Sequence, residues 1–260
     1  MNEEPTIEWR AQTLRLSVFP SSEQVVEIKD WTVLTGSEIP EFQFNHLGVR
    51  RLGGPLFDGQ LQIISARGRV DILLGPPPPP PAVSIEEVET YAVSRLFVGD
   101  AWKAFERFRE MAIRWLNGVE FDVKRLGLGL VAVSLEKDRL EAHRLMKSLL
   151  KSVTMRLGPM QDVAFSVNWP VRSGLDENML LNRMTTWSAI EFKAQMSAPV
   201  PGGLPESDAT TIAQGLQISL DHSTPAAVST PLPRGQLASI FGELCELAEH
   251  NLREGEITCQ

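Results

Sequence analysis

The segment Gly59–Pro81, GQLQIISARGRVDILLGPPPPPP, constrains the fold more than any other part of the chain. Its apolar residues recur at strand spacing in Leu61–Ser65 and in Val70–Leu74, which predicts two strands joined by a turn at Ala66–Arg69. The turn contains a glycine, for which a positive φ costs little. The segment therefore predicts a β-hairpin that stops at a run of six prolines.

The run Pro76–Pro81 can join neither a strand ladder nor a helix interior, because proline has no backbone N–H. It predicts a polyproline II rod that rises roughly 3 Å per residue. One interpretation is a stiff spacer between a sheet and the helix that follows. The other is a ligand for an aromatic groove on a partner protein, although no basic residue lies next to the run to assist such docking.

The chain before the hairpin is expected to be β-structure. Ala11–Phe19 has a period of two that predicts a strand, and Gln24–Thr35 predicts a second, bent strand from its β-branched residues. Ile39–Leu47 is interpreted as a weaker third strand. Gly48–Gly59 contains four glycines and a proline, which predicts a loop.

Helices are expected after the hairpin. A capping box at Ser84–Glu87 predicts that the first one begins just past the prolines. The spacing of apolar residues predicts amphipathic helices at Ala101–Leu116, which has an aromatic stripe and is closed by Gly118, at Asp138–Leu150 and at Gly235–Leu252.

Phe121–Leu135 predicts a long strand with an unusual centre, where Gly127 and Gly129 alternate with leucines. One face of the strand is bare there, so either another group approaches the backbone closely or the strand bulges. Ser197–Ala213 predicts a long loop that is either mobile or functional. Further strands are expected at Val163–Trp169, Thr185–Met196 and Leu216–Leu220.

Strands in runs that are followed by helices favour an α+β fold. We expect a mainly antiparallel, curved sheet with helices packed on one face. A unit of residues 1–118 and a unit of residues 119–260 are expected to form one compact domain. Because Leu16–Pro20 resembles Phe165–Pro170 and similar elements follow each, we interpret the units as similar β-rich halves, with coincidence as the alternative.

The 260-residue chain has a formal net charge of -8. Such an acidic protein is a poor match for nucleic acid or for an anionic membrane surface, which bind basic patches. Cys245 and Cys259 form neither a disulfide framework nor a metal-ligand pattern. The acidic start MNEEPTIEWR has no apolar stretch and is not expected to act as a signal peptide, and the longest apolar run, Leu126–Leu135, is expected to be too short for a membrane span. We expect a cytoplasmic protein without metal or cofactor.

The sequence contains no P-loop, nucleophile elbow or zinc-protease motif, so no catalytic residue is predicted. The candidate ligand-binding residues are Asp221 and His222, a carboxylate beside a histidine at a strand end, together with Arg67 and Arg69 in the hairpin turn. If these groups converge, they can hold a phosphate or a carboxylate. The alternative interpretation is two solvated turns.

Several short segments resemble a sporadically distributed bacterial family of uncharacterised proteins of about this length. The resembling segments are Leu14–Pro20, Gly68–Leu74, Trp115–Leu116, Arg125–Leu130, Leu181–Ser188 and Leu220–Thr224, which span nearly the whole chain. The resemblance implies no activity and no catalytic residues. The patchy distribution of the family implies a phage-defence, toxin-associated or mobile-element context.

Two functions are left open by the sequence. The first is a non-enzymatic protein that binds another protein or forms a homodimer. The second is an enzyme or sensor that binds a small anionic ligand through the loop arginines and His222. A pocket that joins Arg67, Arg69 and His222 would favour the second function, and a flat apolar patch would favour the first.

Overall fold

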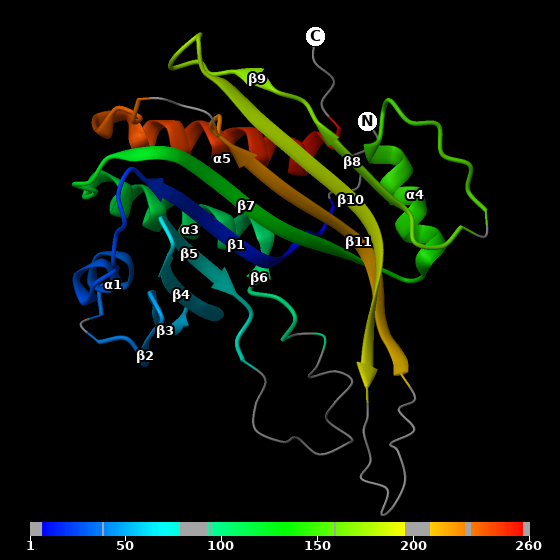
Figure 1. The fold of residues 1–260 in the computed structure, drawn as a ribbon. Helices are drawn as coiled ribbons and strands as arrows, with labels where there is room; N and C mark the ends of the chain where they lie inside the picture. The colour runs from blue at the N-terminus through cyan, green and yellow to red at the C-terminus, as the bar shows by residue number, and fades with distance from the viewer. Residues whose placement is uncertain are drawn as a thin grey trace, which may run out of the picture.

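The computed structural model describes residues 7–37, 39–78, 93, 95–158, 160–195, 209–226 and 230–256 (Figure 1). Its helices are α1 (Ile28–Thr35), α3 (Ala101–Asn117), α4 (Arg139–Leu149) and α5 (Leu237–Glu254), with a short 3₁₀ helix at Arg234–Gln236. Its strands are β1 (Arg10–Pro20), β2 (Phe42–His46), β3 (Val49–Leu56), β4 (Gly59–Ala66), β5 (Arg69–Gly75), β6 (Gly99–Asp100), β7 (Val123–Glu136), β8 (Ala164–Asn168), β9 (Val171–Arg172), β10 (Leu180–Gln195) and β11 (Ala209–Ser223).

The strands of the described chain form one large antiparallel sheet, which confirms the expected α+β class. The strand order is β2-β3-β4-β5-β1-β7-β11-β10-β8, with β6 beside β1 and β9 beside β10. Strands β2 to β5 are a meander of neighbours in the sequence. At the centre, β1 pairs with β5 on one side and with β7 on the other, so that Leu16 lies between Ile72 and Leu128.

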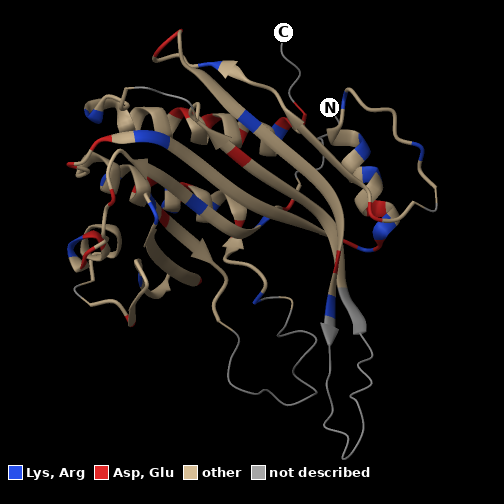
Figure 2. Cartoon of the chain, in the orientation of Figure 1, with Lys and Arg blue, Asp and Glu red and all other residues tan. Residues whose placement is uncertain are grey.

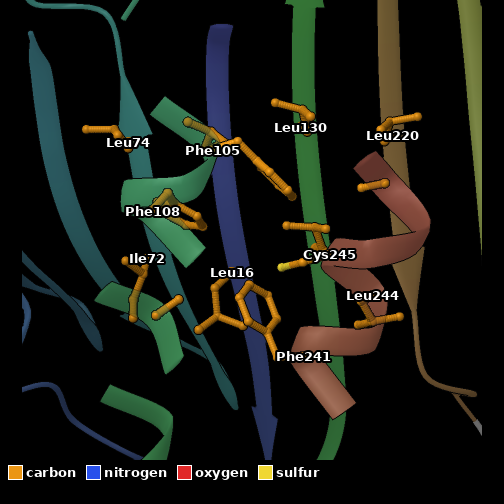
Figure 3. Close-up of a cluster of buried hydrophobic side chains, with 14 of the residues drawn as sticks. Leu16, Ile72, Leu74, Phe105, Phe108, Leu130, Leu220, Phe241, Leu244 and Cys245 are labelled. Carbon is orange, nitrogen blue, oxygen red and sulfur yellow. The ribbon is translucent and has the colours of Figure 1, made fainter. Parts of the chain in front are cut away.

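The main core lies between this sheet and the helices α3 and α5 (Figure 3). Leu16 of β1 and Leu130 of β7 point toward Phe105 and Phe108 of α3 and toward Phe241 of α5, and all five are buried. Burying one such side chain stabilises the fold by about 1.5–3 kcal/mol. We call the side of the sheet that bears these leucines the core face and the opposite side the outer face.

Local capping explains where two of the predicted helices begin. Asp100 accepts a hydrogen bond from the backbone N–H of Lys103 at 2.9 Å, and Asp138 accepts one from that of Glu141 at 3.0 Å. A carboxylate at this position satisfies a backbone donor that has no partner inside the helix. Helices α3 and α4, and likewise α5, confirm the predicted amphipathic segments.

The predicted strand at Gln24–Thr35 is wrong, because most of this segment is helix α1. Glu27 and Asp30 form a capping box, in which Asp30 accepts a hydrogen bond from the backbone N–H of Glu27 at 2.8 Å. Trp31 and Leu34 lie one helical turn apart and are both buried. The cap and the buried pair therefore outweigh the β-branched residues on which the strand prediction depends.

The predicted loop at Gly48–Gly59 is also wrong, because β3 occupies it and pairs with both β2 and β4. Its glycines make room for aromatic rings. A Cβ atom at Gly53 would lie 2.2 Å from the ring of Phe42, and one at Gly54 would lie 3.2 Å from the ring of Trp31. Here the glycines mark close packing on a strand rather than a turn.

The hairpin prediction is confirmed, with β4 and β5 joined at Arg67 and Gly68. The strands expected at Ala11–Phe19, Phe121–Leu135, Val163–Trp169 and Thr185–Met196 are confirmed as β1, β7, β8 and β10. Three expectations lie wholly or partly outside the described residues: the proline rod beyond residue 78, the capping box at 84–87, and the loop at 197–213 up to residue 208. Residues 209–213 of that expected loop belong to β11.

Two contacts fasten the ends of the described chain to the fold. Near the N-terminus, the indole N–H of Trp9 donates to the carbonyl of Leu252 in α5 at 3.1 Å. Near the C-terminus, the carboxylate of Glu256 accepts hydrogen bonds from the backbone N–H and the hydroxyl of Ser152, just after α4. Trp9 and Glu256 are both buried, whereas Ser152 is exposed, so the first contact is buried and the second is partly buried.

Candidate functional site

Asp221 and His222 are consecutive residues that point to opposite faces of the sheet. The strand prediction ends at Leu220, but β11 continues to Ser223, and successive side chains of a strand alternate between faces. Asp221 lies on the outer face with its side chain 62% exposed. His222 lies on the core face and is 0% exposed. The structure therefore does not bring these two candidate ligand-binding residues together.

His222 is part of the core beneath α5. Burial lowers its pKa to about 4, an effect that the nearby charge of Arg183 increases and the backbone of Leu244 opposes. The imidazole is therefore neutral at neutral pH. Arg183, which pairs with His222 across the β10–β11 ladder, is also buried. Neither group is on a surface that a ligand from solvent can reach.

Arg67 and Arg69 flank the glycine of the hairpin turn and have different surroundings. Arg67 is exposed, with a φ of 45°. Arg69 folds over the outer face, where its Nε lies 2.9 Å from an oxygen of Asp71 and its Nη2 lies 3.1 Å from the hydroxyl of Ser17. The structure thus joins Arg69 to Asp71 and Ser17, and the sheet separates it from His222.

Two further outer-face arginines, Arg15 of β1 and Arg125 of β7, lie on the central strands of the sheet and are not among the predicted site residues. Arg15 extends across Gly129, where an added Cβ would lie 3.2 Å from its Nε. Arg125 donates from Nη2 to the hydroxyl of Ser223 at 2.9 Å. Arginines at strand positions carry no motif, so the bare glycines of β7 are the one sequence signal that pointed to this place.

The second candidate surface is apolar and lies at the end of the molecule that contains α1, β2 and β3 (Figure 1). We call this end of the molecule the α1–β2 surface. Six large apolar side chains between residues 25 and 47 are exposed there, each by at least 41%: Val25, Ile28, Val33, Ile39, Phe44 and Leu47. Strand β2 ends the order of paired strands and contains neither a charged residue nor a proline. Charges and prolines are the usual protection of a sheet edge against pairing with another chain.

The predicted ligand-binding residues do not line a common cavity. One of about 360 Å³ lies between α1 and the end of α3, lined in part by Asp30 and Trp115. The Asp30 carboxylate accepts the indole N–H of Trp115 at 3.0 Å and also caps α1, so it is used structurally. Another of about 530 Å³ lies beside Trp102, between α4 and α5. Arg67, Arg69, Asp221 and His222 line neither cavity.

In the described ranges, no three His, Cys, Asp or Glu side chains are grouped so that they could hold a metal ion. The thiol of Cys245 is fully buried, and burial raises its pKa. Among the helices that the structure describes, none has both the length and the apolar composition needed to cross a membrane.

Comparison with known proteins identifies no family. No family model matches the sequence, and no curated protein matches it. One solved structure, the solid-state NMR structure of outer membrane protein AlkL in DMPC lipid bilayers, is 13% identical over 90% of this chain and 100% of its own, with a TM-score of 0.17. A similarity at that level carries no argument about fold or function.

Proposed function

We propose that this chain is a non-enzymatic protein that functions by binding another protein, or a second copy of itself, through the α1–β2 surface. The concentration of exposed apolar residues there carries the proposal. Twelve large apolar side chains are exposed in the described chain, and six of them lie between Val25 and Leu47. Apolar residues scattered singly over a surface are normal, whereas a concentration of them is typical of an interaction site.

The free edge of β2 supports the same conclusion. Its outward backbone N–H and C=O groups can add a strand from another chain, as in other sheets that bind by β-augmentation. Phe44 and Leu47, which are 51% and 87% exposed, lie on this edge and at the turn that follows it. The ligand hypothesis has less support, because Arg69 and His222 lie on opposite faces of the sheet.

We also propose that the helices cover one face of the sheet only and leave the outer face open. Support comes from contacts on the core face: Trp31 of α1 lies against Gly54, and Arg139 of α4 pairs with Glu191 of β10. On the outer face, Arg15 and Asp221 keep side-chain exposures of 39% and 62%.

We further propose that the two halves are equivalent units. The first begins with β1 and α1 and ends with β5 and α3, and the second begins with β7 and α4 and ends with β11 and α5. In each, the last strand pairs with the first, and a helix of the main core follows. This arrangement makes β1 equivalent to β7, whereas the echo between Leu16–Pro20 and Phe165–Pro170 aligns β1 with β8.

The test replaces Phe44 by threonine and Leu47 by asparagine. Threonine retains β-propensity, and asparagine tolerates the positive φ of 49° at position 47. Affinity capture from the host, read beside the native mass of the purified protein, should show a stoichiometric partner or a homodimer for the unmutated chain and neither for the double variant. Unchanged circular dichroism and melting temperature would show that the variant is folded.

A matched control removes two exposed leucines elsewhere, Leu140→Gln in α4 and Leu180→Thr in β10, which are 40% and 48% exposed. This variant should retain the partner or the dimer. An unmutated protein that is a bare monomer with no stoichiometric partner would overturn the proposal. Equal loss of binding in the control would show that the α1–β2 surface is not the interface.

A further inference from the structure

We infer that the outer face of the sheet carries a second binding site, for an acidic polypeptide segment, formed by Arg69 and Arg125 over Phe19 and by Arg15, four residues before Phe19 on β1. These residues come from β1, β5 and β7, which are neighbours at the centre of the sheet. Each alternates with buried core residues, so the side chains emerge on the same face. This site is separate from the α1–β2 surface, and the inference does not rest on that surface.

Phe19 is the centre of the site. It lies directly opposite Arg125 in the β1–β7 ladder. The guanidinium carbon of Arg125 is 5.2 Å from the centroid of its ring, and that of Arg69 is 5.4 Å from the same centroid. One ring thus holds two guanidinium groups by cation–π contacts. Two positive groups over one ring repel each other, and an anion bound between them would relieve that repulsion.

The guanidinium groups have more N–H donors than the neighbouring residues have acceptors. A guanidinium has five N–H donors, and the acceptors provided nearby are Asp71, Ser17 and Ser223. The Nε groups of Arg15 and Arg125 are buried and have no hydrogen-bond partner among the described residues, so an incoming carboxylate would meet the Nη groups instead. Nη2 of Arg15 is 3.9 Å from Asp221, beyond hydrogen-bond distance. Incoming carboxylates would supply the acceptors that the chain itself does not.

The residues between the arginines are small. Gly127 pairs with both Ser17 and Ser223, and an added Cβ there would lie 3.7–3.8 Å from those residues. Ser17 and Ser223 are only 4% and 3% exposed, and Arg69 and Arg125 donate to their hydroxyls, so a peptide would lie against the arginine side chains above this strip of small residues. Neighbouring strands are about 4.8 Å apart, so the three arginines span a distance suited to several residues of a peptide rather than to one small anion.

The pattern of charge selects the class of ligand. Arg15 lies near Asp221, and Arg69 is paired with Asp71, so both signs alternate across the strip. Positive and negative residues are likewise interspersed along the strands in Figure 2. A nucleic acid, with a uniform row of phosphates, would meet both aspartates. A peptide can place its acidic side chains at the arginines and neutral or basic ones at the aspartates.

The test uses a short fluorescent peptide of alternating Glu and Ser, with a version in which Gln replaces Glu and an oligothymidylate as comparisons. Fluorescence anisotropy should show that the unmutated protein binds the Glu peptide and neither comparison, with an affinity that falls as salt is added. Arg15→Gln with Arg125→Gln should weaken this binding roughly tenfold or more, because charge-assisted hydrogen bonds are lost.

The matched control removes the same charge from the helices, with Arg107→Gln and Arg144→Gln, and should bind as the unmutated protein does. The α1–β2 variant, Phe44→Thr with Leu47→Asn, should also retain peptide binding, which separates the failure of one proposal from that of the other. No binding of the Glu peptide, equal binding of the Gln version, or tighter binding of oligothymidylate would overturn the inference.

A second measurement needs no mutation. Phenylglyoxal modifies exposed arginines, and mass spectrometry reads each site. The Glu peptide should slow modification of Arg15 and Arg69, whose side chains are 39% and 37% exposed, and leave Arg144, at 51%, unaffected. Equal modification with and without bound peptide would show that it binds elsewhere, even if the arginine variants do not fold.

Discussion

Arg183 lies directly opposite His222 in the β10–β11 ladder, and both side chains are buried on the core face beneath α5. A second positive charge beside Arg183 is unfavourable in an interior from which water is excluded. Burial and Arg183 together therefore keep the imidazole of His222 neutral, with a pKa of about 4. Folding therefore favours the neutral form of this histidine.

We predict that stability falls as the pH is lowered from about 6.5 to about 4, because the unfolded chain binds a proton on His222 in this window and the folded chain does not. The full contribution is present above the unfolded pKa. Over the whole window the loss from this one group is about 3 kcal/mol. Urea unfolding at a series of pH values measures it.

The control for that prediction is a pair of histidine-to-glutamine variants. His222→Gln should be less stable at neutral pH, and its stability should lose most of the dependence on pH between about 6.5 and about 4. His46→Gln, at an exposed site on β2, should keep that dependence. His143, whose pKa is also lowered by burial, is present in both and cancels. A pH profile that is the same in all three proteins would contradict the role assigned to His222.

We predict that Gly215→Ala destabilises the fold by roughly 1–3 kcal/mol through overpacking. An added Cβ would lie 2.3 Å from the carbonyl oxygen of Ser134 on the neighbouring strand β7, and backbone cannot move aside as a side chain can. Gly75→Ala is the matched change, since nothing lies within 4 Å of its Cβ position. Thermal unfolding should separate the two variants, and equal midpoints would contradict the close approach.

The parts of the fold that depend on local sequence signals were predictable. The pairing of strands that are distant in the sequence was not. The cap at Asp138 and the stripe through Phe105 and Phe108 are encoded within one or two helical turns, so α3 and α4 can be read from the sequence. Helix α1 has only eight residues and is capped by Glu27 and Asp30, which are weaker signals than serine or threonine at the start of a long helix.

The candidate site was less predictable for a geometric reason. Ending the predicted strand at Leu220 makes Asp221 and His222 a turn, but three more strand residues place them on opposite faces. Arg125 is placed opposite Phe19, and Arg15 opposite Gly129, by pairing between strands more than a hundred residues apart, which no local pattern encodes. Gly129 correctly indicated a close approach, although the sequence could not say that Arg15 makes it, whereas the neighbours of Gly127 lie at ordinary contact distance.

We predict that Glu256→Ala destabilises the protein by roughly 1–3 kcal/mol, because the backbone N–H of Ser152 would lose its buried acceptor. Glu254→Ala is the control two residues away. Its carboxylate lies 3.9 Å from Lys151 with both side chains more than half exposed, so its loss should change stability by less than about 0.5 kcal/mol. Denaturant titrations of both variants decide the point, and a Glu256 variant as stable as the control would contradict the contact.

We predict that the thiol of Cys245 is unreactive in the folded protein. It is 0% exposed in the core beside Leu244, and burial raises its pKa, so the reactive thiolate is both rare and enclosed. In a Cys259→Ser background Cys245 is the one remaining thiol. A disulfide reagent should then label almost nothing in buffer and one thiol per chain in guanidinium chloride.

The rate of that labelling should follow global unfolding, because α5 must leave the sheet before the reagent can reach the sulfur. Destabilised variants such as Gly215→Ala should therefore label faster in proportion to their loss of stability, and Gly75→Ala should not. Rapid labelling of the unmutated fold, at a rate independent of stability, would instead show that α5 separates from the sheet locally and that the core in Figure 3 opens without unfolding.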